Sequence, residues 1–152
     1  MHLAHYLALA HRAETALGDA FRAVGEDHAD EPDVYFTCRR LAAQCAEHTR
    51  LLQPLADRYG QEAPDEPERL HATLFSGTRS GPLGLLRDLH DLYLMATQSQ
   101  LCWTVIVQAA QGARDNQLLD VVRACQPQTT LQVKWLLTRV KQAAPQALVV
   151  AE

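Results

Sequence analysis

Apolar residues recur along most of this chain at steps that alternate between four and three positions. One example is the run Val34, Cys38, Leu41, Cys45, in which every side chain falls on one face of an α-helix. No segment of strand length alternates apolar and polar residues with a period of two. The pattern therefore predicts an all-α protein. Four helices are expected, over residues 3–26, 33–59, 83–112 and 116–143.

The connections between these helices differ in length. The first two helices are joined by a short acidic segment, in which Asp30 and Pro32 are suited to begin the second helix. The last two are joined by a few residues after Gly112, whereas residues 60–82 are far longer than a helical hairpin needs. This order predicts a four-helix bundle with one long crossover between the second and third helices. Pro127 is expected to bend the fourth helix or open it locally.

Composition narrows the class of protein. The chain has 152 residues, 47% of them apolar, which predicts a single four-helix domain over residues 1–152. The formal net charge is −4 with both signs interspersed, so neither nucleic acid nor an anionic membrane is an expected partner. The longest apolar run, Leu101 to Ala110, is shorter than the roughly 20 residues that cross a bilayer. Without the features of a secretory signal at its start, the chain is expected to be cytoplasmic.

The four cysteines suit a helical core better than a metal site or a disulfide framework. They match neither a zinc-ribbon spacing nor a CxxC motif. All four fall within helical stripes, which predicts reduced and buried thiols. The residues are Cys38, Cys45, Cys102 and Cys125.

Polar side chains interrupt the apolar stripes near the middle of each helix. In an antiparallel hairpin, two residues lie at the same height when their midpoint in the sequence coincides with the turn. The midpoint of Glu14 and His48 falls inside the acidic turn, so these side chains are expected to face each other. Ser99 and Thr129 are level in the second hairpin, with Gln132 one turn away. The sequence thus predicts a polar belt across the middle of the bundle.

This layout resembles the ferritin-like superfamily. Its di-metal members place a Glu on each of two helices and a Glu-x-x-His motif on each of the other two, all pointing inward. By this resemblance Glu14 corresponds to the first-helix glutamate and His48 to the second-helix histidine, while Cys45 stands where that motif has its glutamate. The resemblance implies a ferritin-like four-helix bundle with a degenerate di-metal site.

The second half of the chain departs further from the family pattern. Ser99 occupies the third-helix glutamate position, and Thr129 with Gln132 replace the fourth-helix Glu-x-x-His. A di-iron centre needs bridging carboxylates to neutralise two metal charges, and one carboxylate with one imidazole does not supply them. Ferroxidase or oxygenase activity is therefore not expected.

Two functions stay open from the sequence. In the first, the bundle is a non-catalytic structural or interaction module, and Glu14 and His48 form a buried hydrogen-bonded pair. In the second, the chain is a metal-binding protein or a metal-dependent oxidoreductase. One zinc or iron ion would then be held by Glu14, Cys45 and His48, with Gln132 as a further candidate. The register of the fourth helix is also open, which makes Gln128 an alternative inward-facing residue.

Other histidines and carboxylates are interpreted as solvated. His5 and His11 are six positions apart and do not share one helical face, which argues against a histidine cluster on the first helix. Asp88, His90 and Asp91 are interpreted as a polar face of the third helix.

The third helix carries more apolar surface than one stripe requires. The run LCWTVIVQAA, which begins at Leu101, is apolar on nearly every side. A second covered face is therefore expected, and a homodimer formed through this helix is the favoured cover. The alternative is that the long crossover covers it.

Overall fold

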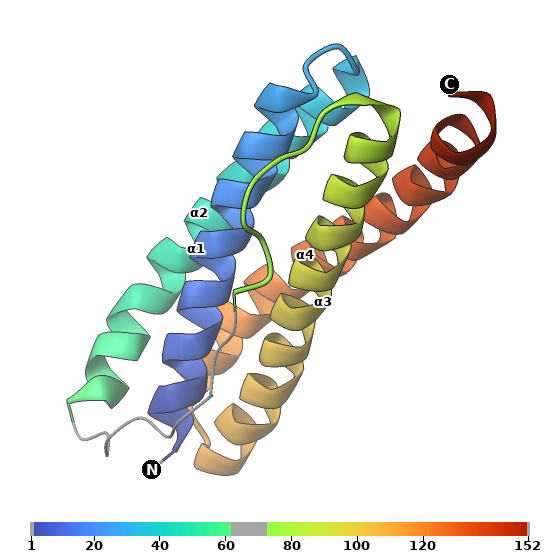
Figure 1. Cartoon of the computed structure of the whole chain (residues 1–152). Helices are drawn as coiled ribbons and strands as arrows, with labels where there is room; N and C mark the ends of the chain where they lie inside the picture. The colour runs from blue at the N-terminus through green and yellow to red at the C-terminus, as the bar shows by residue number, and fades with distance from the viewer. Residues whose placement is uncertain (1, 62–72, 152) are drawn as a thin grey trace.

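The computed structural model describes residues 2–61 and 73–151, which form a bundle of long helices (Figure 1). No strand occurs within these two ranges. The all-α prediction and the four predicted helices are therefore confirmed. The helices are α1 (Leu3–Asp27), α2 (Pro32–Gly60), α3 (Gly81–Ala113) and α4 (Asn116–Pro145), and a short π-helical turn, η1 (Gln146–Val150), follows α4.

Local chemistry explains where several helices begin and end. Pro32 occupies the first turn of α2, where a backbone N–H has no helical partner to lose. Asp115 caps α4, because its side chain accepts a hydrogen bond from the backbone N–H of Leu118 at 3.1 Å. Arg114 adopts a left-handed φ of 54° and ends α3. Each observed end of the four helices lies within two residues of its expected position.

A bend or a local opening was expected at Pro127, and the fourth helix continues across this residue without an opening. Cys125 and Thr129, on either side of the proline, are both fully buried. Their packing holds this part of the chain in the helix, although the proline supplies no backbone donor. The buried stripe of α4 is therefore continuous as far as Gln132 and beyond.

The helices pair as two antiparallel hairpins. α1 packs against α2 and α3 against α4, and the hairpins meet where α1 lies beside α3 and α2 beside α4. Figure 1 shows that α3 begins at the opposite end of the bundle from the end of α2. Residues 73–80 lead into α3, and Phe75 packs against the core. The rest of the predicted crossover, residues 62–72, lies outside the described residues.

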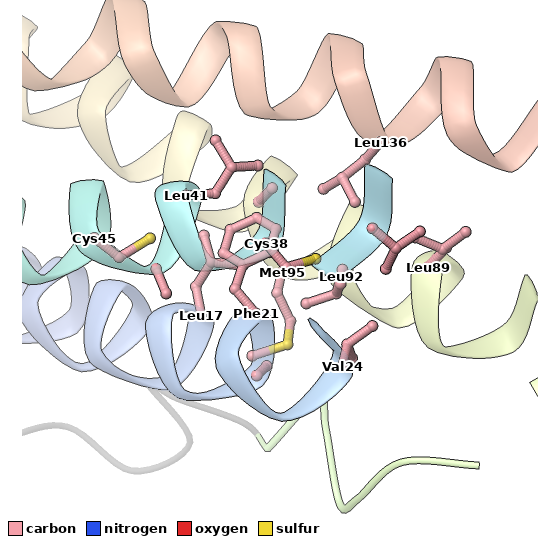
Figure 2. Close-up of a cluster of buried hydrophobic side chains, with 14 of the residues drawn as sticks. Leu17, Phe21, Val24, Cys38, Leu41, Cys45, Leu89, Leu92, Met95 and Leu136 are labelled. Carbon is pink, nitrogen blue, oxygen red and sulfur yellow. The ribbon is translucent and has the colours of Figure 1, made fainter. Parts of the chain in front are cut away.

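Two hydrophobic clusters fill the interior. The first lies toward the α1–α2 turn, and Figure 2 shows Phe21 of α1 among residues from the other helices. Its other members include Leu17, Val24, Leu41, Leu89, Leu92, Met95 and Leu136. The second lies toward the other end of the bundle and includes Leu7, Leu52, Trp103, Ile106 and Leu118. Glu14, His48, Ser99, Thr129 and Gln132 lie between these two clusters along their helices.

Two glycines allow α1 and α2 to approach closely. A Cβ atom on Gly25 would lie 2.9 Å from the Cβ of Cys38, and one on Gly18 would lie 3.1 Å from the Cβ of Cys45. Larger residues at these positions would push the helices apart. This close packing fixes the height of α1 relative to α2, which brings Glu14 level with a residue of α2.

The prediction of reduced, buried cysteines is confirmed. All four thiols are free and buried. Burial raises the pKa of Cys38 to about 12 and that of Cys102 to about 11. These groups are therefore protonated near neutral pH and behave as small apolar side chains.

Candidate functional site

Glu14 from α1 and His48 from α2 meet in the middle of the bundle. The Nδ1 atom of His48 lies 3.1 Å from Oε2 of Glu14, and each residue is only 1% exposed. The predicted register of the first hairpin is thus correct for this pair. An acid and an imidazole are brought together at a depth that bulk water does not reach.

Two further residues complete the hydrogen bonding of this pair. The indole Nε1–H of Trp103 in α3 donates to Oε1 of Glu14 at 3.1 Å. The Nε2 atom of His48 lies 2.8 Å from Oε1 of Gln128 in α4. The imidazole and indole rings also meet edge to face, with centroids 5.9 Å apart. Both carboxylate oxygens and both ring nitrogens therefore have protein partners, contributed by all four helices.

This arrangement favours the charged form of His48. Its two partners, Glu14 and Gln128, both present oxygen atoms, so each ring nitrogen donates a hydrogen bond. Burial lowers the pKa of His48, but the hydrogen bond to Glu14, the charge of Glu14 and the hydrogen bond to Gln128 outweigh burial and raise it above the ordinary value. Below this raised pKa the imidazolium of His48 lies next to Glu14, and the two charges compensate each other.

Cys45 and Gln132 extend the belt on one side. The amide Nε2 of Gln132 donates to Oε1 of Gln44 at 3.0 Å and lies 3.9 Å from the sulfur of Cys45. Burial, followed by the negative charge of Glu14, raises the pKa of the Cys45 thiol far above its ordinary value. Cys45 is therefore a protonated thiol, whereas zinc binds the thiolate.

The two remaining belt positions predicted from the sequence are also buried. Thr129 donates through its hydroxyl to the backbone carbonyl of Cys125 at 3.4 Å. Within the described chain, Oγ of Ser99 and Oε1 of Gln132 have no hydrogen-bond partner. The belt thus contains one satisfied hydroxyl and two buried polar atoms without a protein partner.

The belt does not fit the di-metal centre that the resemblance implies. Among the described residues, no group of three or more His, Cys, Asp and Glu is arranged to hold a metal ion. Glu14 and His48 hydrogen-bond to each other, and Cys45 keeps its proton, so a metal ion would have to displace existing bonds and a proton. A single zinc or iron ion on these three residues therefore stays a prediction and gains no support from the geometry.

A second buried polar cluster lies near the α1–α2 turn and was not predicted. Nε2 of His28 lies 2.7 Å from Oδ2 of Asp88. Arg79, just before α3, donates to Asp88 from its backbone N–H and its Nη1, each at 2.9 Å. The same Nη1 donates to Asp91, also at 2.9 Å. We call His28, Arg79, Asp88 and Asp91 the end cluster.

The interpretation of Asp88, His90 and Asp91 as a solvated face was wrong for both aspartates. Asp88 is 0% exposed and Asp91 is 8% exposed, whereas His90 is exposed and contacts Arg87. Asp88 and Asp91 are buried because Arg79 donates to both and supplies the compensating positive charge, and Asp88 also has a hydrogen-bond partner in His28.

The interpretation of the first-helix histidines as solvated was also wrong for one of them. His5 is buried and packs against the ring of His2, whereas His2 is exposed. His11 is half-buried. These rings do not form a common site, in agreement with their spacing.

No known protein family, curated protein or solved structure matches this chain. Any functional conclusion therefore depends on the geometry of the belt, of the end cluster and of the surface.

Proposed function

We propose that this protein is a non-catalytic, ferritin-like four-helix bundle that acts as a structural or interaction module. The observation that carries this proposal is the closed hydrogen bonding of the Glu14–His48 pair. By the resemblance, Glu14 and His48 correspond to metal ligands of the superfamily, yet their four polar atoms all contact protein groups. A catalytic centre instead needs a group that can reach a substrate or an open coordination position.

The belt has a structural role that explains why these residues are buried. The imidazolium of His48 provides the positive charge next to Glu14, so no ion is required for neutrality. Bonds from Trp103 and Gln128 connect this pair to the second hairpin. A slip of one hairpin along the other would leave buried charges unpaired, so the belt fixes the register between the hairpins.

The outward face of α3 supports self-association as the mode of interaction. Leu94 and Leu101 lie seven positions apart on this face and are 47% and 63% exposed. Leu83, near the start of α3, is also exposed. Leucines repeated at this spacing on two copies of one helix can pack against each other across a two-fold axis. The proposed partner is therefore a second copy of this chain, bound through α3.

We also propose a cytoplasmic location, because four free thiols suit a reducing compartment. No helix in the described parts of the chain has an apolar stretch long enough to cross a membrane.

Metal analysis of the purified protein tests the non-catalytic function. We expect zinc and iron well below one ion per chain, and no difference between the natural chain and His48→Gln. Stoichiometric metal that is lost in His48→Gln and in Glu14→Gln would overturn the proposal. It would instead establish the alternative, a metal-binding protein or metal-dependent oxidoreductase that uses Glu14, Cys45 and His48.

Sedimentation velocity at micromolar concentration tests the dimer. The natural chain is expected to sediment as a dimer and Leu101→Glu as a monomer, because the substitution places two like charges in the interface. The matched control is Phe36→Glu on α2, which changes another exposed apolar residue and should leave the dimer intact. A monomeric natural chain, or equal dissociation by both substitutions, would remove the α3 interface.

A further inference from the structure

A cavity of about 860 Å³ opens at the end of the bundle where α1 turns into α2. Figure 1 shows this end of the bundle, where α3 begins and the C-terminus lies. The α1–α2 turn, the first turn of α3, the last turns of α4 and η1 form its walls. A volume of this size is typical of sites for small molecules.

One ring in this wall is buried and held in a fixed orientation. His28 is 4% exposed and lines the cavity, and its Nε2 contacts Asp88 of the end cluster. The carboxylate of Asp88 accepts this bond, and it also accepts hydrogen bonds from the backbone N–H and the Nη1 of Arg79. Nε2 is therefore the donor nitrogen of the ring. Nδ1 of His28 makes no hydrogen bond with any described group. This nitrogen, in a ring that lines the cavity, is therefore available to a ligand.

The charges around the cavity are unequally paired. Arg139 lies 3.1 Å from a carboxylate oxygen of Glu31 and 2.7 Å from one of Asp33, so one positive charge is shared by two carboxylates. Asp27 and Asp30 also line the cavity, and no cation of the described chain lies within ion-pair distance of either. Asp27 accepts a hydrogen bond from the hydroxyl of Thr78. The wall therefore has an excess of negative charge on its α1–α2 side.

We propose that this cavity binds a small aliphatic amine in its ammonium form. The ammonium groups would meet the carboxylates of Asp27 and Asp30, and one N–H would donate to Nδ1 of His28. The alkyl part would pack against the apolar part of the wall, which includes Leu85 and Val150. Such a ligand would use three features of the wall, which are the unpaired carboxylates, the unpartnered nitrogen of His28 and the apolar surface. This site is separate from the belt and does not depend on the proposed structural role.

Calorimetric titration with 1,4-diaminobutane at low ionic strength tests the proposal. We expect saturable binding at one site per chain, with no measurable binding of 1,4-butanediol, which has the same carbon chain without charge. Replacing both Asp27→Asn and Asp30→Asn should weaken diamine binding about tenfold or more. Both residues are exposed, so the variant is expected to fold normally.

The matched control removes two exposed carboxylates elsewhere, through Asp57→Asn and Asp120→Asn. It makes the same change in net charge and should bind the diamine as the natural chain does. Amide chemical shifts in NMR spectra should move at Gly81 and Val150, which line the cavity. Equal weakening by both double variants, equal binding of the diol, or shifts spread over the whole acidic surface would each overturn the proposal.

Discussion

His48 and His28 are both buried histidines held by a carboxylate from another helix, but their surroundings differ. The pair of His48 and Glu14 is sealed between two hydrophobic clusters, and all of its polar atoms have protein partners. The pair of His28 and Asp88 lies beside a cavity. Arg79, which also binds Asp88, has a side chain that is 42% exposed. In the first arrangement every polar atom of the pair has a protein partner, whereas in the second Nδ1 of His28 has none among the described residues, and the ring lines a cavity.

Because of this difference, we expect the belt to contribute mainly to folding stability and the region around His28 to contribute to ligand binding. In the belt, removing one group leaves an opposite charge that neither water nor another residue can reach. In the end cluster, Arg79 can turn toward solvent when its partner is lost. We therefore expect substitutions in the belt to act mainly on folding, and substitutions around His28 to act more on ligand binding.

The largest expected effect is on the belt. Glu14→Ala should lower the free energy of unfolding by about 3–5 kcal/mol, because it leaves the imidazolium of His48 buried without a counter-charge. The milder Glu14→Gln should cost about 1–3 kcal/mol, since an amide oxygen still accepts a hydrogen bond. Urea unfolding monitored by circular dichroism measures both. If Glu14→Ala proved as stable as the natural chain, the sealed pair would not exist as described.

Asp88→Ala in the end cluster should have a smaller effect, about 2 kcal/mol in the same experiment. Asp88 is fully buried, so its loss leaves His28 without a partner. Arg79, by contrast, is partly exposed and can be solvated by water. Asp88→Asn is the matched control, because it keeps an acceptor for His28 and should cost less. A loss as large as that of Glu14→Ala would show that the two regions are equally sealed.

The belt and the end cluster also differ in how far the sequence could predict them. Glu14 and His48 lie on strictly periodic stripes, so the geometry of a helical hairpin was sufficient to pair them. Trp103 lies on such a stripe too, but the pattern treats it as an apolar residue and gives no sign that its N–H reaches Glu14. Gln128 was recognised only as an alternative, because side-chain reach decides whether a residue at the edge of the stripe points inward.

The end cluster was missed for a different physical reason. Arg79 lies in the irregular segment before α3, where no period relates a residue to its spatial neighbours. A signal did exist for Asp88, which follows Leu85 by three positions and precedes Leu92 by four, and so lies on the buried stripe of α3. A carboxylate on such a stripe indicates a buried partner, but the sequence does not show which residue that is.

The stability contributed by the belt should depend on pH. The pKa of His48 is raised in the folded protein above the ordinary value of 6.5, despite burial, through the hydrogen bond and charge of Glu14. Its contribution is therefore complete below about pH 6.5 and is lost as the pH rises through the folded pKa, at about 1.4 kcal/mol for each unit of the shift. Urea unfolding at several pH values should show this decline.

The comparison for this pH dependence is Glu14→Gln, in which the decline should be much weaker because the carboxylate charge is absent. The other charge that acts on His48 is that of Glu47, on the same helix, which is exposed and remains in both proteins. A decline of equal size in the two proteins would assign the effect to another group.

The smallest expected effect concerns the buried hydroxyl of Ser99. Its Oγ has no hydrogen-bond partner among the described residues, so Ser99→Ala removes an unpaired polar atom and should leave the free energy of unfolding within about 0.5 kcal/mol of the natural value, or raise it. Thr129→Val is the matched comparison, because it removes a hydroxyl that donates to the Cys125 carbonyl and should cost about 1 kcal/mol. If Ser99→Ala cost as much as Thr129→Val, the Ser99 hydroxyl would have a partner in solution. The belt would then be open to water or to another small molecule, and the contrast between its sealed interior and the cavity beside His28 would fail at that position.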